Sequence, residues 1–199
     1  MDMVNHVQDV TSIMKTSKTS TLDFNDSINV ALFNFIKLHP VVIDPTLDVY
    51  ELDYHNLKEN ITTLEPAFAT LPEPMKPLFT NTGVSSESDV AHGKIIMQKF
   101  KSIVNTLYHD SITIVAGTDM GFPGFSLPRE LELYVDAGLK PMQALQTATI
   151  TPAKVMKMEA TSGSVEAGKK ADLIIVNGDP LQNIRNIRKV TVVMKDGNL

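Results

Sequence analysis

Two segments of the sequence combine an amphipathic helical pattern with a short apolar strand directly after it. The first begins at Asp26 and leads into Val41–Ile43, and the second begins at Ser86 and leads into Ile112–Ala116. In both, apolar residues recur at helical spacing before the apolar run begins. A helix followed by an apolar strand, twice over, is typical of a parallel sheet covered by helices. The sequence therefore predicts an α/β fold.

The segments beside these two units are less regular. Residues 1–20 are polar and rich in serine and threonine, which predicts a strand end followed by a loop. Residues 46–82 are rich in proline and polar residues, and we expect a long loop there with one short helix between His55 and Leu64. Long loops in compact domains are usually functional or mobile. A cluster in this loop could bind a metal, but a solvated loop explains it better: Asp48, Glu51, Asp53 and His55.

The last third of the sequence changes from helical to β patterns. Three short helices are expected after residue 119, opened by Pro128, Pro141 and Pro152. Two β-rich runs follow at 171–176 and 189–194, with a turn and no helix between them. We therefore expect two parts, residues 1–160 and residues 161–199, of which the second is a small β domain.

Composition excludes several classes of partner. The chain has 23 acidic and 18 basic residues, a net charge of -5, and no basic run, which argues against nucleic acid. Cysteine is absent, so disulfides and thiolate metal sites are excluded. No apolar run reaches the 18 or more residues of a membrane span, and the first 30 residues lack the pattern of a signal peptide. The compartment stays open, with the cytoplasm as the default.

A carboxylate stands directly after the second apolar strand. Ile112–Ala116 runs into Gly117, Thr118 and Asp119. Catalytic groups collect at the carboxyl ends of the strands in a parallel α/β barrel, which makes Asp119 a candidate catalytic residue. Taken alone, Gly-Thr-Asp is also ordinary turn chemistry, so a structural turn is the alternative.

From residue 117 onward the sequence carries a series of short motifs: Gly117–Asp119, Leu131–Leu133, Ala137–Pro141, Ala144–Leu145, Ala148–Thr149, Pro152–Ala153 and Gly168–Leu173. In this order they resemble the C-terminal half of the metal-dependent amidohydrolase superfamily, above all its imidazolonepropionase-like and prolidase-like branches. The resemblance is best over residues 110–199.

The resemblance implies a fold and a site. The fold is the C-terminal part of a (β/α)8 TIM-type barrel, about strands six to eight, followed by part of a small β-sandwich. Asp119 then matches the catalytic aspartate that contacts the metal and acts as acid and base. His6, in the segment Asp2–His6, resembles the metal-ligating histidine of the sixth strand, with a partly exposed terminal histidine as the alternative. The cofactor would be one or two divalent metal ions, with zinc expected.

The resemblance also implies a reaction. Metal-activated water would attack the carbonyl of a C–N bond in a small amide, cyclic amide or dipeptide. Residues that shape the substrate pocket are left open among four aromatic residues of the long loop: Tyr50, Tyr54, Phe68 and Phe79.

The expected metal site is short of ligands. The family pattern needs a His-x-His pair, a lysine and a further histidine on earlier strands, and no remaining histidine stands in such a pair. A catalytic zinc normally takes three protein ligands, and a whole barrel takes about 250 residues. We therefore expect a C-terminal fragment that is inactive alone and needs a complementing N-terminal half or a second copy. The alternative is a non-catalytic remnant that serves as an assembly or binding module.

Overall fold

The computed structural model describes residues 2–16, 21–119 and 121–199. These residues form eight α-helices: α1 (Val7–Ile13), α2 (Ser27–Leu38), α3 (Leu47–Asp53), α4 (Lys76–Thr80), α5 (Glu87–His109), α6 (Ser126–Asp136), α7 (Pro141–Thr147) and α8 (Ile150–Val155). They also form four short 3-10 helices: η1 (Ile61–Thr63), η2 (Pro66–Thr70), η3 (Glu73–Met75) and η4 (Ile184–Arg188). The strands are β1 (Asp2–Asn5), β2 (Val41–Asp44), β3 (Thr113–Ile114), β4 (Leu173–Val176) and β5 (Val190–Met194).

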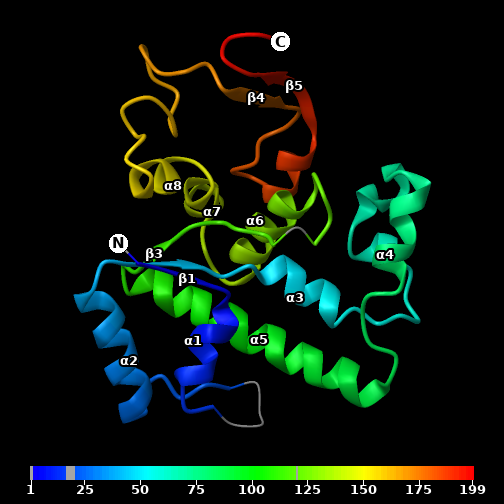
Figure 1. Ribbon diagram of the computed structural model, residues 1–199, viewed down its shortest axis with the longest axis vertical. Coiled ribbons are helices and arrows are strands. Elements are labelled where there is room, and N and C mark those ends of the chain that lie inside the picture. Colours follow the sequence, from blue (N-terminus) through cyan, green and yellow to red (C-terminus); the bar gives the residue numbers. More distant parts are fainter. Residues whose placement is uncertain (1, 17–20, 120) are drawn as a thin grey trace.

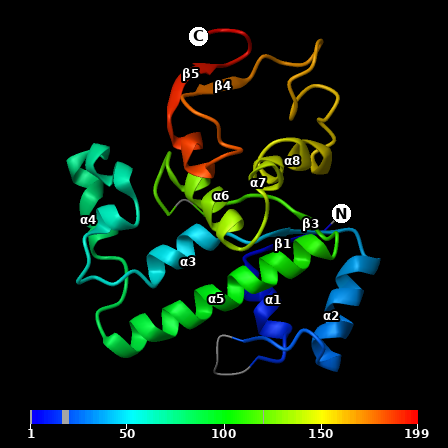
Figure 2. The ribbon, with the colours of Figure 1, turned by 180° about the vertical axis from the view of Figure 1, so that it is seen from behind.

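A three-stranded parallel sheet lies in the middle of the molecule, with the strand order β1-β2-β3. Its register pairs Val4 with Ile43 and Ile43 with Ile114. In both views of the ribbon, α1, α2 and α5 lie on one side of this sheet, and α6 to α8 with the β4–β5 sheet lie on the other (Figures 1 and 2). The predicted α/β fold with a parallel sheet is confirmed. Because all three strands run the same way, their carboxyl ends meet at one edge.

The main core lies between this sheet and its helices. Both Val42 and Ile43 of β2 are fully buried, which explains why the central strand is a continuous apolar run rather than an alternating one. On α5, Ile103, Val104 and Leu107 are fully buried, and each such side chain contributes about 1.5–3 kcal/mol. None of the helices in the described ranges is long and apolar enough to cross a membrane.

The predicted starts of the two long helices are confirmed. The Asp26 carboxylate accepts the backbone N–H of Ile28 at the start of α2, at 3.0 Å. The Ser86 hydroxyl accepts the N–H of Asp89 at the start of α5, also at 3.0 Å. Such caps satisfy backbone donors that a helix leaves open at its first turn.

Predictions for two segments are wrong. The segment after β1 was expected to be a loop, but it forms α1, because Val7 and Val10 are buried against the core. Residues 17–20 of that expected loop lie outside the described residues. In the proline-rich region the α-helices are α3, at 47–53, and α4, at 76–80, whereas 55–64 contains only the 3-10 turn η1.

Of the acidic cluster expected in a solvated loop, Asp53 is exposed as predicted, but the other three residues are placed differently. Asp48 is only 2% exposed and His55 only 8%, and Glu51 forms an ion pair with Arg129 of α6. These side chains are drawn inward because α3 packs against both α5 and α6.

Strands β4 and β5 form an antiparallel sheet of their own. Ile174, Ile175 and Val193 are at least half exposed, so this sheet has little apolar cover. The 3-10 helix η4, which was not predicted, lies between the two strands. Its Arg188 binds Glu132 of α6 and Glu65, and these ion pairs attach the small sheet to the rest of the chain.

Candidate active site

The carboxyl ends of the three parallel strands bring together residues that are far apart in the sequence. His6 follows β1, Asp44 ends β2, and Asp119 lies in the turn after β3. The backbone N–H of His6 donates to the carbonyl of Asp44 at 2.7 Å. The charges of His6 and Asp119 both act on the Asp44 carboxyl, which places the three side chains in one neighbourhood.

The backbone at these strand ends is strained. His6, Thr46 and Asp119 have φ angles of 70°, 51° and 44°, in the region that favours glycine. Such conformations cost about 1–3 kcal/mol each and persist only where the surroundings enforce them. Three strained residues at three neighbouring strand ends are a pattern typical of a functional site.

A hydrogen bond fixes the tautomer of His6. The Thr46 hydroxyl, 2.6 Å from His6 Nδ1, donates its single proton to the carbonyl of Pro45 at 2.8 Å. Its oxygen must therefore accept from Nδ1–H of His6. Nε2 is left with a free lone pair, as in histidines that ligate a metal and donate their other N–H to a neighbour.

The Asp44 carboxylate is partly buried and closely packed. Its Oδ1 atom is buried without a hydrogen-bond partner among the described residues. Burial raises the pKa of the Asp44 carboxyl, against the backbone N–H of Gly117 and the charge of His6, which lower it. A Cβ atom on Gly117 would overlap the Asp44 carboxylate, so this glycine makes room for the side chain.

Asp119 is exposed, and its charge acts on the groups around it. It contributes to the raised pKa values of Asp44, Tyr50 and Asp53, although burial is the main cause for each. The Tyr50 ring meets the His6 ring edge-on at 6.2 Å between centroids. Burial raises the pKa of Tyr50 to about 12, so its hydroxyl stays protonated and can donate a hydrogen bond.

A buried carboxyl supports the loop after β2. Glu130 of α6 is fully buried and accepts the backbone N–H groups of Leu47 and Asp48, at 2.9 and 2.7 Å. Burial raises its pKa to about 8 and that of Asp48 to about 7. Glu130 thereby fixes the start of α3 and, through it, the position of Thr46.

Sequence reasoning singled out His6 and Asp119 and left Tyr50 open as a residue of the substrate pocket, but it gave Asp44 and Thr46 no role in the site. The signal for Asp44 was present, because it follows an apolar strand just as Asp119 does. The contact between Thr46 and His6 spans 40 positions and has no local signature.

The described residues do not make up a complete metal site. In the ranges that the structure describes, no three His, Asp or Glu side chains can hold a metal ion together. Nε2 of His6 and the carboxylate of Asp119 have the chemistry of two ligands for a divalent metal, and a catalytic zinc takes three. The described residues therefore fit part of such a site but not a whole one.

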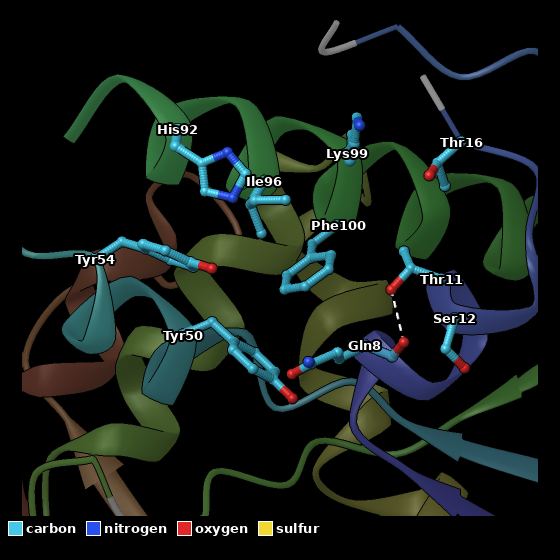
Figure 3. Close-up of a pocket in the computed structure, with 10 residues that line it drawn as sticks. All are labelled: Gln8, Thr11, Ser12, Thr16, Tyr50, Tyr54, His92, Ile96, Lys99 and Phe100. Carbon is cyan, nitrogen blue, oxygen red and sulfur yellow. Dashed lines mark hydrogen bonds between the residues drawn. The ribbon is translucent and has the colours of Figure 1, made fainter. Parts of the chain in front are cut away.

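The four aromatic candidates for a substrate pocket separate into two pairs. Tyr50 and Tyr54 line a pocket between α1, α3 and α5 (Figure 3). Phe68 and Phe79 instead belong to a buried cluster that contains Phe122. The second pair serves the core.

Comparisons with known proteins show similarity to one family of enzymes and to its fold. The sequence model of the amidohydrolase family matches residues 6–199. An imidazolonepropionase from Symbiobacterium thermophilum is 38% identical over 69 residues, which cover 33% of this chain and 16% of that protein. An adenine deaminase from Clostridium botulinum is 32% identical over 65 residues, which cover 33% of this chain and 10% of that protein.

The structure of a Xaa-Pro dipeptidase with bound methionine in its active site has a TM-score of 0.62 at 23% identity, covering 99% of this chain and 39% of that one. The chain thus spans well under half the length of these proteins.

Proposed function

Because the chain belongs to the amidohydrolase family, we propose that it is the C-terminal part of a metal-dependent hydrolase of C–N bonds in small amides, cyclic amides or dipeptides. Relatives named as an imidazolonepropionase and a Xaa-Pro dipeptidase support this class of substrate. The observation that carries the proposal is His6, whose free Nε2 lies at the same strand edge as Asp119.

The proposed position in the fold follows from the sheet. The likeness to solved structures of this family is one of fold, and it extends over the whole chain. We assign β1, β2 and β3 to the sixth, seventh and eighth strands of a TIM-type barrel, with residues 1–160 as the barrel part. Residues 161–199 then supply strands to a small β-sandwich. The parallel order of the three strands and the separate β4–β5 sheet support both assignments.

The chain's own residues would divide the chemistry among them. His6 and Asp119 would hold a divalent metal, which is zinc in this proposal. When bound, the metal would lower the pKa of a water molecule. Asp119 takes a proton from the attacking water and passes it to the leaving nitrogen. The Tyr50 hydroxyl, protonated throughout the neutral range, donates a hydrogen bond to the substrate. Asp44 adds negative charge to the site and favours cationic groups there.

The remaining ligands would come from a complementing N-terminal half. Within the described residues β1 pairs only with β2, so its outer edge is open to another strand. A largely apolar groove of about 630 Å³ lies beside this strand and reaches His6. It is lined by Met3 of β1, Ile13 of α1 and Phe35 of α2, which are exposed apolar residues. A strand and helix added here would cover the groove and bring new side chains next to His6.

Co-expression with the missing part tests the proposal. We expect the purified 199-residue chain to show no zinc-dependent hydrolysis of amide and dipeptide substrates, and the complemented protein to show it. Asp119→Asn and His6→Ala should each abolish that activity. Asp110→Asn, at the opposite end of β3, should leave it unchanged.

Other outcomes would reject parts of the proposal. Robust zinc-dependent hydrolysis by the chain alone, lost in Asp119→Asn, would refute its incompleteness. Activity of the complemented protein that survives both site substitutions would reject the assigned residues. A stable complemented assembly without any hydrolysis would favour the alternative, a binding or assembly module.

A further inference from the structure

A second pocket lies beside Tyr50, between α1, α3 and α5. Its volume is about 360 Å³, at the lower end of the roughly 300–1,000 Å³ typical of ligand pockets. Figure 3 shows that α1, α3 and α5 each contribute one face to it. Neither His6 nor Asp119 lines this pocket, and Tyr50 is the residue that it shares with the candidate active site.

Aromatic rings form much of the pocket wall. Tyr50 and Phe100 meet at 5.0 Å between centroids with an interplanar angle of 67°, and Tyr54 and His92 meet at 6.0 Å with 71°. Phe100 is 3% exposed, and Ile96 lies beside it on α5. A flat aromatic ring could pack against these groups in offset or edge-on geometry, which aromatic pairs prefer.

Unused polar groups face the same space. In the part of the chain that the structure describes, the Tyr50 and Tyr54 hydroxyls, the Gln8 carboxamide and the His92 ring have no hydrogen-bond partner. The Thr11 hydroxyl donates to the carbonyl of Gln8, so its oxygen offers an acceptor. Donors therefore stand beside acceptors, which matches the two edges of an amide group.

The position of Tyr54 depends on a glycine inside a long helix. A Cβ atom on Gly93 would come within 2.5 Å of the Tyr54 Cβ atom. Glycine weakens the interior of a helix, and here it lets Tyr54 lie directly against α5. The position of this part of the pocket wall therefore depends on how α3 packs on α5.

The charges around the pocket are mixed. Lys99 of α5 lines the pocket, while Asp9 and Asp53, which do not line it, are near enough to Tyr50 to raise its pKa further. Neither sign dominates, so a ligand with a net charge would meet a group of like charge on one side. An uncharged ligand avoids this repulsion as well as the cost of removing a charge from water.

We propose that this pocket binds a small, uncharged aromatic amide of about the size of benzamide. The ring packs on Phe100 and the tyrosines, and the carboxamide pairs with Gln8 and a tyrosine hydroxyl. This binding needs no metal and no complementing chain, so it can fail or succeed independently of the proposed hydrolase activity.

Titration of the isotope-labelled chain with four matched probes, followed by NMR, tests the proposal. The probes are benzamide, cyclohexanecarboxamide, benzoate and benzylamine. We expect benzamide to give saturable shifts at Ile96 and Phe100, and to bind about tenfold more tightly than cyclohexanecarboxamide because of its ring. Benzoate and benzylamine should bind about tenfold more weakly than benzamide.

Single substitutions in the pocket test whether the ligand binds there. Tyr54→Phe and Gln8→Ala should each weaken benzamide binding about five- to tenfold, the effect of one lost hydrogen bond. Tyr108→Phe and Gln98→Ala, which lie outside this pocket, should have no effect. An unchanged dispersion of amide signals shows that each variant is folded.

The proposal is overturned by the absence of saturable benzamide binding or by equal binding of the non-aromatic amide. It is also overturned by tighter binding of a charged probe, or by undiminished binding in both pocket variants.

Discussion

Replacing Glu130 with glutamine tests whether the buried carboxyl beneath α3 is protonated in the folded protein. Burial raises its pKa from 4.5 to about 8, against the two backbone N–H groups of Leu47 and Asp48, which lower it. The charge of Asp48 adds to the rise. Glutamine keeps the size of the side chain but cannot ionise.

The sign of the effect follows from proton binding. Between pH 4.5 and 8 the folded protein keeps the proton on Glu130, whereas the unfolded chain has released it. The free energy of unfolding therefore falls as the pH rises through this window, by about 1.4 kcal/mol per pH unit. From pH 5.5 to 7.5 the loss due to this group is about 2.7 kcal/mol. Glu130→Gln should lack this loss. Any effect of the amide on hydrogen bonding to Leu47 and Asp48 shifts its curve by a constant.

Urea unfolding followed by circular dichroism, at half-unit steps from pH 5.5 to 7.5, measures the difference in slope. Asp48 titrates in both proteins, so only the difference between them reports on Glu130. Glu159→Gln, an exposed control, should keep the wild-type slope. Parallel curves for the wild type and Glu130→Gln would show that Glu130 is ionised in the fold and would refute the reasoning.

Two further substitutions test the packing around the site. Gly117→Ala places a methyl group where the Asp44 carboxylate lies, and we expect a loss of about 1–3 kcal/mol in urea unfolding. An unchanged midpoint would mean that Asp44 moves aside freely. Arg188→Met leaves Glu65, whose side chain is 1% exposed, without its cation, and should cost about 3 kcal/mol. Lys195→Met removes an exposed ion pair and should cost nothing measurable, so equal losses for the two variants would contradict the role of the buried pair.

The sequence was sufficient where structure depends on near neighbours. The caps of α2 and α5 join residues two or three positions apart, Asp26 to Ile28 and Ser86 to Asp89. The apolar run of β2 reflects burial on both faces of the sheet, which leaves a direct trace in composition. Such signals need no knowledge of the rest of the fold.

The sequence was insufficient where distant residues decide local structure. A helix of seven residues such as α3 is marginal by itself. Its first two N–H groups are accepted by Glu130, 83 and 82 positions away. The same holds for Asp48, which looks like a loop residue until α6 covers it. Only the packed fold reveals these contacts.

The strained strand ends bear on what a complementing chain would have to supply. His6 is oriented by the Thr46 hydroxyl, and the loop after Thr46 is held by Glu130. These constraints come from within the chain and involve neither a metal nor another strand. If His6 is a ligand, as we propose, its position is thus fixed in advance, and a partner needs to add ligands rather than rearrange this residue. We therefore expect complementation to raise zinc affinity while the amide signals of His6 and Thr46 keep their dispersion. Thr46→Val should lower that affinity, because it leaves Nδ1 of His6 without its acceptor.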